Sequence, residues 1–241
     1  MSGPLSGQVA PLSGQIALIT GASRGLGAAT SVALAAAGAH VVLLAKTVGA
    51  LEETDDRVRT VGGSATIMPL DLVEVEKLAV LGPTLFQRFG RLDIFVAAAA
   101  DLGQLTSVPH ADPKVWDRVL AVNLTANQRL IATLDPLLRA APAGRAIFIT
   151  DRTALAARAY WSAYGASKAA LEQIVEAWKI EAAIKPALQI ELFDPGPMST
   201  RLRAKAFPGE KPGTQPSPEI AAQRLVALIM GEELRETRRV G

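Results

Sequence analysis

Apolar residues occur along this chain as short runs that are separated by longer segments of mixed polarity. The short runs are almost continuously apolar, which is typical of parallel strands buried on both faces. They predict six strands, at residues 15–20, 40–45, 66–70, 93–99, 145–150 and 189–193. The segments between and after them predict helices that end near residues 37 and 89, and helices at 51–60, 113–138, 162–184 and 218–230.

The alternation of strands and helices predicts an α/β protein, with a doubly wound parallel sheet in three layers, α/β/α. A chain of 241 residues suits a single domain, which we expect to cover residues 15–241. Residues 1–14 are rich in Gly, Pro and Ser, contain a near-duplicated segment, and predict a mobile tail. Residues 197–217 are rich in Pro, Gly and charge, and predict a lid over a site at the carboxyl ends of the strands.

A glycine-rich loop follows the first predicted strand. Gly21, Gly25 and Gly27 stand in the order Gly-x3-Gly-x-Gly before an alanine-rich helix. This order suits a dinucleotide site, because glycines let the backbone approach a pyrophosphate and the helix N-terminus supplies N–H donors. A simple turn is the alternative, and it requires three well-placed glycines by coincidence.

The charges near this loop indicate which dinucleotide would bind. In folds that prefer NAD, an acidic residue after the second strand holds the ribose 2′-hydroxyl. Here that strand ends at Ala45 and is followed by Lys46, while Arg24 lies in the glycine loop. Two cations suit a 2′-phosphate, so we favour NADP(H) over NAD(H), with two solvated cations as the alternative. Asp71, which follows the third strand, could reach an adenine amine.

Tyr164 and Lys168 stand four residues apart in a predicted helix, which places both side chains on one face. A nearby cation lowers the pKa of a tyrosine, and a tyrosine tuned in this way can exchange a proton with a substrate oxygen. Alone the pair is weak evidence, because this spacing is common on solvated helices.

Composition argues against several classes of function. The net charge is only +2 and no basic stripe alternates with aromatic residues, so we expect no nucleic-acid partner. Cysteine is absent, and His40 and His110 are far apart in the sequence, so we expect no metal site. No apolar run is as long as a membrane span and no secretory signal is recognisable, which predicts a cytoplasmic protein without a membrane partner.

In order and spacing, these pieces resemble the short-chain dehydrogenase/reductase family over residues 14–230. The residues that carry the resemblance are Thr20, Gly21, Gly25, Gly27, Asp71, Asn123, Tyr164, Lys168, Pro195, Gly196 and Thr200. The segment from Thr200 is similar to that of a bacterial branch of the family. The resemblance implies a Rossmann-like fold, a nicotinamide cofactor, a small-molecule substrate, and a homodimer or homotetramer formed through the helices around 114–138 and 162–184.

The resemblance also implies residue roles. Tyr164 would be the acid/base, Lys168 would bind the nicotinamide ribose, and Asn123 would hold a water in the proton relay, or else be a buried residue at a helix bend. The cofactor would contact Gly21, Ser23, Arg24, Gly25, Leu26, Gly27, Lys46, Asp71, Leu72, Ala98, Lys168, Pro195, Gly196 and Thr200. The substrate would be bordered by Asp101, Leu102, Arg152, Trp161, Pro197 and Met198.

The family's catalytic serine is replaced in this chain. It normally stands thirteen residues before the tyrosine, and that position is Asp151 here. An ionised carboxylate cannot donate a hydrogen bond, and at about 4 Å and a dielectric near ~20 it opposes a second negative charge by about 4 kcal/mol. Three explanations are open. Asp151 is protonated or acts on a nitrogen substrate, where it is similar to the aspartate of the pteridine reductases. Alternatively, Thr150 or Thr153 supplies the hydroxyl that the serine would provide, or the site binds the cofactor with little turnover. Arg152 could neutralise Asp151.

Two further departures concern the fold. Residues 97–100 are alanines where the family usually has Asn-Asn-Ala-Gly, which we expect to affect stability more than cofactor binding. The family's last strand is not recognisable after Met230. The sheet is therefore shorter than in the family, or residues 240–241 replace the last strand imperfectly.

Three functions are consistent with the sequence. The first is an NADP(H)-dependent oxidoreductase that transfers hydride between the nicotinamide and a small carbonyl or imine. The second is a catalytically weak, cofactor-binding sensor or scaffold protein of the same fold, which Asp151 favours. The third is a pteridine-type reductase. We rank the oxidoreductase first, because an idle site has no need to keep Asn123, Tyr164 and Lys168 together.

Overall fold

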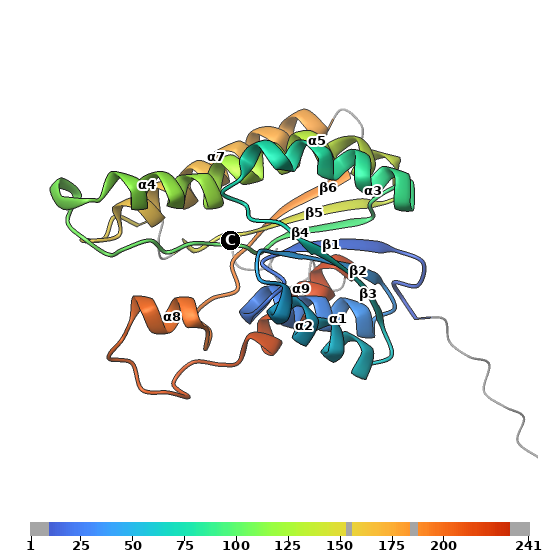
Figure 1. Ribbon diagram of the computed structural model, residues 1–241, viewed down its shortest axis with the longest axis horizontal. Helices are drawn as coiled ribbons and strands as arrows, with labels where there is room; N and C mark the ends of the chain where they lie inside the picture. Colours follow the sequence, from blue (N-terminus) through green and yellow to red (C-terminus); the bar gives the residue numbers. More distant parts are fainter. Residues whose placement is uncertain (1–9, 153–155, 184–187, 232–241) are drawn as a thin grey trace, which may run out of the picture.

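The computed structural model of the protein describes residues 10–152, 156–183 and 188–231 (Figure 1). They form a six-stranded parallel sheet with the strand order β3-β2-β1-β4-β5-β6. The strands are β1 (Ile16–Thr20), β2 (His40–Ala45), β3 (Ser64–Pro69), β4 (Ile94–Ala97), β5 (Gly144–Ile149) and β6 (Leu188–Phe193). The chain winds from β1 outward to β3, and then from β4 outward to β6 on the other side, so the predicted doubly wound sheet is confirmed.

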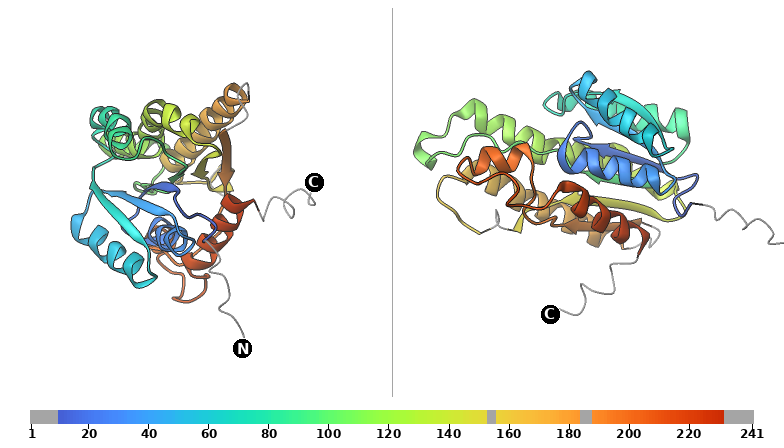
Figure 2. Two further views of the ribbon diagram at one scale, coloured as in Figure 1. Left: turned by 90° about the vertical axis from the view of Figure 1, so that its right-hand side faces the viewer. Right: turned by 90° about the horizontal axis from the view of Figure 1, so that it is seen from below.

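Helices cover both faces of this sheet (Figures 1 and 2). One face is covered by α1 (Gly25–Ala36), α2 (Val48–Thr60) and α9 (Pro218–Met230). The other face is covered by α3 (Leu81–Phe89), α5 (Ala126–Ala140) and α7 (Ser162–Ala182). Two further helices, α4 (Pro113–Leu120) and α8 (Arg201–Ala206), extend past the same end of the sheet (Figure 1). Within the described segments, no helix is both long enough and apolar enough to cross a membrane.

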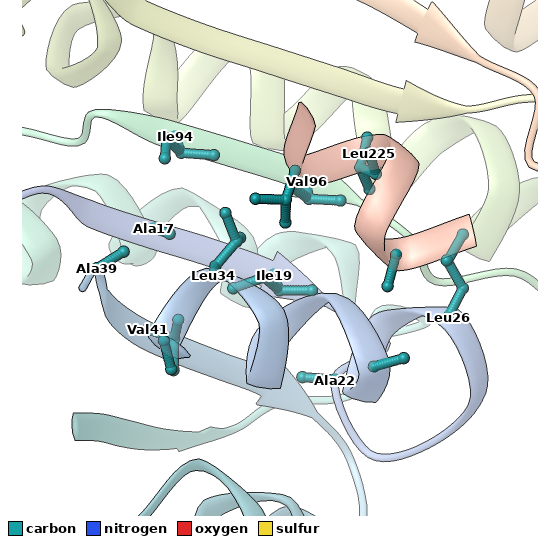
Figure 3. Close-up of a cluster of buried hydrophobic side chains, with 14 of the residues drawn as sticks. Ala17, Ile19, Ala22, Leu26, Leu34, Ala39, Val41, Ile94, Val96 and Leu225 are labelled. Atoms are coloured by element: carbon teal, nitrogen blue, oxygen red, sulfur yellow. The ribbon is translucent and has the colours of Figure 1, made fainter. Parts of the chain in front are cut away.

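The strands contribute side chains to two hydrophobic cores, one on each face of the sheet, because alternate residues of a strand point to opposite faces. In β1, Ile19 belongs to the core under α1 and α9, whereas Leu18 belongs to the core under the opposite helices. Figure 3 shows the first core, in which Leu34 of α1 lies beside Ile19 and Leu225 of α9 lies beside Val96 of β4. Because both faces of the central strands β1, β2 and β4 are buried, these strands need apolar residues at nearly every position, which explains their continuous apolar runs.

The helix predicted at 113–138 is divided. It consists of α4, a π-helical turn η3 (Ala121–Thr125), and α5, and the fully buried Asn123 lies in the π-helical turn. The helix expected before residue 89 is likewise a 3₁₀ turn, η1 (Val75–Val80), followed by α3. The prediction missed both because the periods of these helix types differ too little over one turn to be separated by apolar spacing.

Other segments differ from the prediction in extent. β4 is shorter than expected, and neither α8 nor the short 3₁₀ turn η2 (Val108–His110) was predicted. The end of the predicted mobile tail forms a packed turn: Leu12 is buried, and its N–H donates to the carbonyl of Ala37 at 2.9 Å. The rest of that tail and the segment expected to hold a last strand fall at residues 1–9 and 232–241, outside the described residues.

The core beneath α7 should depend strongly on Phe148. Its ring is fully buried and makes edge-to-face contacts with Phe95 at 5.6 Å and with Trp178 at 6.1 Å between centroids. Phe148→Ala should lower the free energy of unfolding in urea by about 3–5 kcal/mol, because it leaves a cavity between two rings. Phe86→Ala is the control, since Phe86 is 59% exposed, and it should cost less than about 0.5 kcal/mol. Equal losses in the two variants would contradict this account of the core.

Candidate active site

A cleft of about 1400 Å³ lies where the carboxyl ends of the strands meet. Its walls come from the segments that follow each of the strands, together with α8. It is lined by every residue predicted to contact the cofactor: Gly21, Ser23, Arg24, Gly25, Leu26, Gly27, Lys46, Asp71, Leu72, Ala98, Lys168, Pro195, Gly196 and Thr200. It is also lined by most of the predicted substrate-side residues: Asp101, Leu102, Trp161, Pro197 and Met198. Arg152 is the exception, because it is exposed and does not line the cleft.

Two glycines let the loop after β1 pack closely at the floor of the cleft. Gly21 has a φ of 68°, and a Cβ atom there would lie 2.8 Å from the Cα of Ala99. A Cβ atom on Gly27 would lie 2.3 Å from the carbonyl oxygen of Gly21. Larger residues would clash at both positions, so glycine is what allows the loop to lie against the end of β4 and the first turn of α1.

The N-terminus of α1 opens into the cleft. Arg24, the residue before its first turn, is extended and makes no side-chain capping hydrogen bond, and the first turn, all of it described, has no acidic residue. The first N–H groups of α1 therefore lack a side-chain acceptor from their own cap, and the helix dipole adds positive potential, which suits an anion. Thr200 lies nearby, since its Cγ2 would be 3.4 Å from a Cβ atom on Gly25.

Lys46 and Asp71, which were both predicted at the adenosine end, are neighbours. Lys46 Nζ lies 3.8 Å from Asp71 Oδ2, and the lysine side chain is 69% exposed. An exposed pair contributes only about 0–1 kcal/mol, so Lys46 can still meet an added anion. Arg24 is exposed and lines the same cleft, which leaves two cations at this end.

Tyr164 and Asp151 face one another in the cleft. The hydroxyl of Tyr164 donates to Oδ2 of Asp151 at 3.4 Å, and the tyrosine is 4% exposed. Burial raises the pKa of Tyr164, and the negative charge and hydrogen bond of Asp151 raise it further. This direction is opposite to the lowering expected from Lys168. In this arrangement Tyr164 is held as a protonated phenol.

Lys168 lies beside Tyr164, with 5.8 Å between its Nζ and the centroid of the tyrosine ring. It is 3% exposed, and its Nζ donates to the carbonyl of Ile149 at 2.7 Å. Burial lowers the pKa of Lys168 to about 8, although the neighbouring carboxylates, Asp151 foremost, oppose the shift. Burial therefore dominates the ionisation of both Tyr164 and Lys168, in opposite directions along the pH scale.

Asn123 lies behind the cleft, fully buried, and does not line it. Its Oδ1 accepts from the N–H of Asp101 at 2.7 Å, and its Nδ2 donates to the carbonyl of Asp101 and to Ser167 Oγ, each at 2.9 Å. Its side chain thus ties the segment after β4 to α7. The polar atoms of its side chain are therefore engaged, and its backbone carbonyl accepts from Asn127 Nδ2 at 2.8 Å.

The contacts of nearby residues bear on the alternatives raised by Asp151. Thr150 donates its hydroxyl to Glu172 of α7, so this hydroxyl is already engaged, and Thr153 lies outside the described residues. Arg152 is exposed, whereas Arg203 of α8 interacts electrostatically with Asp151. The segment that holds Arg203 therefore places a positive charge opposite the carboxylate.

Sequence reasoning missed a group of basic and aromatic residues that line the outer end of the cleft: Arg118, Arg158, Arg203, Lys205 and Phe207. A weak signal existed in α8 and just after it, where basic residues alternate with apolar ones in Arg-Leu-Arg-Ala-Lys-Ala-Phe. Arg158 carried no signal, because it lies in an irregular loop before α7.

Comparison with known proteins identifies the class. The family model for short chain dehydrogenase matches residues 15–211, so the chain belongs to the short-chain dehydrogenase family, as its motifs indicated. YciK, an uncharacterised oxidoreductase of Escherichia coli K12, is 30% identical over 219 residues, which are 90% of this chain and 86% of YciK. FrzI, a short-chain dehydrogenase/reductase of Cladobotryum, is 33% identical over 77% of this chain and 71% of its own.

Solved structures agree with this assignment. A protein assigned as a short chain dehydrogenase from Pseudomonas syringae superposes with a TM-score of 0.89 at 32% identity, covering 95% of this chain and 94% of its own. One from Escherichia coli CFT073, solved in complex with NADPH, has a TM-score of 0.88 at 30% identity and covers 95% of each chain. One from Shigella flexneri, in complex with NADP, has a TM-score of 0.85 at 29% identity and covers 92% of each chain.

The buried Lys168 should make stability depend on pH in a definite direction. Its pKa is about 8 in the folded protein, against an ordinary value of 10.5, so the unfolded chain binds more protons between these values. The cost of burying the charge is complete below about pH 8 and is relieved as the pH rises through this window. Relative to Lys168→Met, wild type should gain on the order of 3 kcal/mol of unfolding free energy across it. Urea denaturation at each pH measures this.

Lys179→Met is the matched control for that experiment, because Lys179 lies on the same helix with its side chain 42% exposed. Its curve of unfolding free energy against pH should run parallel to that of wild type. If the curve for Lys168→Met also ran parallel, Lys168 would not be desolvated in the folded protein.

Proposed function

We propose that this protein is an NADPH-dependent reductase of a small compound that contains a carbonyl or imine group. The observation that carries the proposal is the pair formed by a buried, protonated Tyr164 and a buried Lys168 in the cleft. A protonated phenol that lines the cleft can donate a proton to a substrate. Family membership supports oxidoreductase chemistry.

The glycine cradle fits a dinucleotide. Gly21 and Gly27 give a pyrophosphate access to the backbone, and the N-terminus of α1 offers it N–H donors. Arg24 and Lys46 would hold the 2′-phosphate that distinguishes NADP(H) from NAD(H), which stays the alternative. The complexes of the E. coli CFT073 and S. flexneri relatives with NADPH and NADP support the preference. Asp71 would lie at the adenine.

The residues of the chain then have separate tasks. A bound reduced nicotinamide would be the source of the hydride for the C=O or C=N carbon of the substrate, and would become oxidised nicotinamide. Tyr164 donates its hydroxyl proton to the substrate oxygen or nitrogen, so the product is an alcohol or an amine. Lys168 would hold the nicotinamide ribose. Asn123 fixes the backbone around Tyr164, and its carbonyl would hold the water through which the tyrosine regains a proton.

Asp151 favours a nitrogen substrate over a simple ketone. An ionised carboxylate accepts hydrogen bonds, so it would orient an N–H group or a protonated imine beside Tyr164. The same charge opposes negative charge on a carbonyl oxygen, unless Arg203 offsets it. A pteridine-type reductase is therefore the second candidate, since dihydropterins carry C=N bonds. A catalytically weak sensor or scaffold is the third.

We further propose that the protein acts as a homodimer or homotetramer in the cytoplasm, with α4, α5 and α7 at the interface. Ile180 of α7 supports this, because it is a large apolar side chain that is 74% exposed in the single chain.

Replacement of Tyr164 tests the proposed reaction. Tyr164→Phe should lower the rate of NADPH oxidation by at least about 100-fold on a panel of aldehydes, ketones, quinones, imines and dihydropterins, because it removes the proton donor. The Kd for NADPH, measured by fluorescence titration, should change less than about threefold, because the phenol is not a cofactor anchor. Near wild-type turnover in this variant would remove Tyr164 from the mechanism.

Asp151→Ser separates the candidates in the same assay. Loss of activity on a nitrogen heterocycle would assign Asp151 to substrate orientation and favour the pteridine-type reductase. An inert wild type whose serine variant reduces carbonyls would show that the aspartate has disabled the site, and tight NADPH binding without turnover in either protein would favour the sensor.

The cofactor preference should depend on Lys46. Lys46→Ala should weaken NADPH binding by roughly 10-fold and leave NADH binding nearly unchanged, because only NADPH carries the 2′-phosphate. Lys77→Ala is the control, since Lys77 is paired with Glu74 and does not line the cleft. Equal affinity of wild type for NADH and NADPH would overturn the preference.

A further inference from the structure

The outer end of the cleft contains an arginine that stacks against two aromatic rings, which also contact each other with 5.7 Å between their centroids. The guanidinium carbon of Arg158 lies 4.8 Å from the ring centroid of Trp161 and 5.6 Å from that of Phe207. Trp161 begins the segment that leads into α7, whereas Phe207 follows α8, so the arginine joins the two sides of the cleft. Stacking holds the planar group in place while its five N–H donors at the edge remain available to a ligand.

The other three basic residues of the group at the outer end of the cleft already have oxygen partners. Arg118 is paired with Asp101 at 2.7 Å, Arg203 is paired with Glu210 at 2.7 Å, and Lys205 donates to the carbonyl of Gly103 at 2.6 Å. The guanidinium of Arg158 has no hydrogen bond or ion pair to any residue that the structure describes, only the two ring contacts. A guanidinium that lines a cleft and makes no hydrogen bond to the described residues is suited to bind an anionic ligand.

The backbone around Arg158 is arranged in a way that holds this position. Tyr160 has a φ of 73°, a conformation that is unfavourable for a residue with a side chain. The N–H of Trp161 donates to the carbonyl of Arg158 at 3.2 Å, and the N–H of Thr106 donates to the carbonyl of Tyr160 at 3.1 Å. These contacts place Trp161 as the wall between Tyr164 and Arg158.

Asp151 and Arg158 lie at different places along the cleft, and the Trp161 ring connects them through Tyr164. Asp151 lies at Tyr164 and opposes an anion close to the reacting atom. The Trp161 ring contacts Tyr164, with 5.9 Å between centroids, and Arg158 stacks on that same indole ring. Trp161 also packs with Leu102 and Ala206, which gives the middle of the cleft an apolar surface.

We propose that Arg158 binds an anionic group, a carboxylate or a phosphate, at the end of the substrate remote from its reducible C=O or C=N bond. This inference rests on the proposed reductase function, and it narrows the substrate class to compounds with an apolar middle and one remote negative charge. Compounds whose carboxylate adjoins the reducible bond, as in 2-oxo acids, gain nothing from this site, because they carry no remote anion for Arg158.

The test compares matched substrates with NADPH at saturation: 4-formylbenzoate with a remote anion, its uncharged methyl ester, and benzoylformate with an adjacent anion. Wild type should prefer 4-formylbenzoate in kcat/KM. Arg158→Met should lower that value by roughly 10- to 100-fold, mainly through KM, and change the ester by less than about threefold. Arg158→Lys should retain part of the preference. The same comparison is made with 4-formylphenyl phosphate. The site is a phosphate site if Arg158→Met lowers kcat/KM more for the phosphate than for the carboxylate, and a carboxylate site in the opposite case.

Lys211→Met is the matched control, because it removes the same charge from the segment after α8 at an exposed position that does not line the cleft. It should behave as wild type. Equal losses of kcat/KM for the acid and the ester in Arg158→Met would mean that Arg158 only packs Phe207 against the loop, which would overturn the proposal. Absence of a preference for the acid over the ester in wild type would also overturn it.

If no aldehyde is reduced by wild type, the reductase proposal lacks support, but the anion site is still decided by binding. Isothermal titration of terephthalate, a dicarboxylate of the same shape, into the protein with NADP⁺ present should then show binding to wild type and loss of roughly 10-fold or more in Arg158→Met. No binding to wild type, or equal binding to both proteins, would overturn the inference.

Discussion

The close contact between the glycine loop and the end of β4 determines where everything else in the cleft can lie. At Gly21 the backbone comes so near to Ala99 that no side chain would fit, and the N–H of Ala99 donates to Thr20 Oγ1 at 3.2 Å. This contact falls between β1 and β4, where the winding of the sheet reverses and the strand ends diverge to form a crevice. The alanines after β4 keep their backbone role here, although they lack the family's asparagine side chains.

Burial controls the ionisation of Tyr164 and Lys168 in that crevice more than the neighbouring charges do. It raises the pKa of Tyr164 and lowers that of Lys168, and Asp151 adds to the first effect and opposes the second. The ionisation of both groups therefore depends on how completely they are shielded from water. The segment around α8 takes part in this, because Arg203 brings a positive charge toward Asp151 and is itself paired with Glu210.

Much of the fold could be predicted because its information is local. Continuous apolar runs such as 40–45 become β2, and the glycine spacing after β1 marks a loop that must pack without side chains. The π-helical turn around Asn123 could not be predicted in this way. It is stabilised by hydrogen bonds to Asp101 and Ser167, which are distant in the sequence, and these outweigh the local preference for a regular α-helix.

The sequence by itself determined the α/β class, the order of strands and helices along the chain, and the residues gathered at the strand ends, because parallel strands bring their carboxyl ends to one edge whatever their loops do. Only the tertiary structure decided the direction in which the pKa of Tyr164 shifts, the partner of Thr150, and the stacking of Arg158 against Trp161 and Phe207. These depend on burial and on contacts between segments far apart in the chain, neither of which leaves a periodic pattern in the sequence.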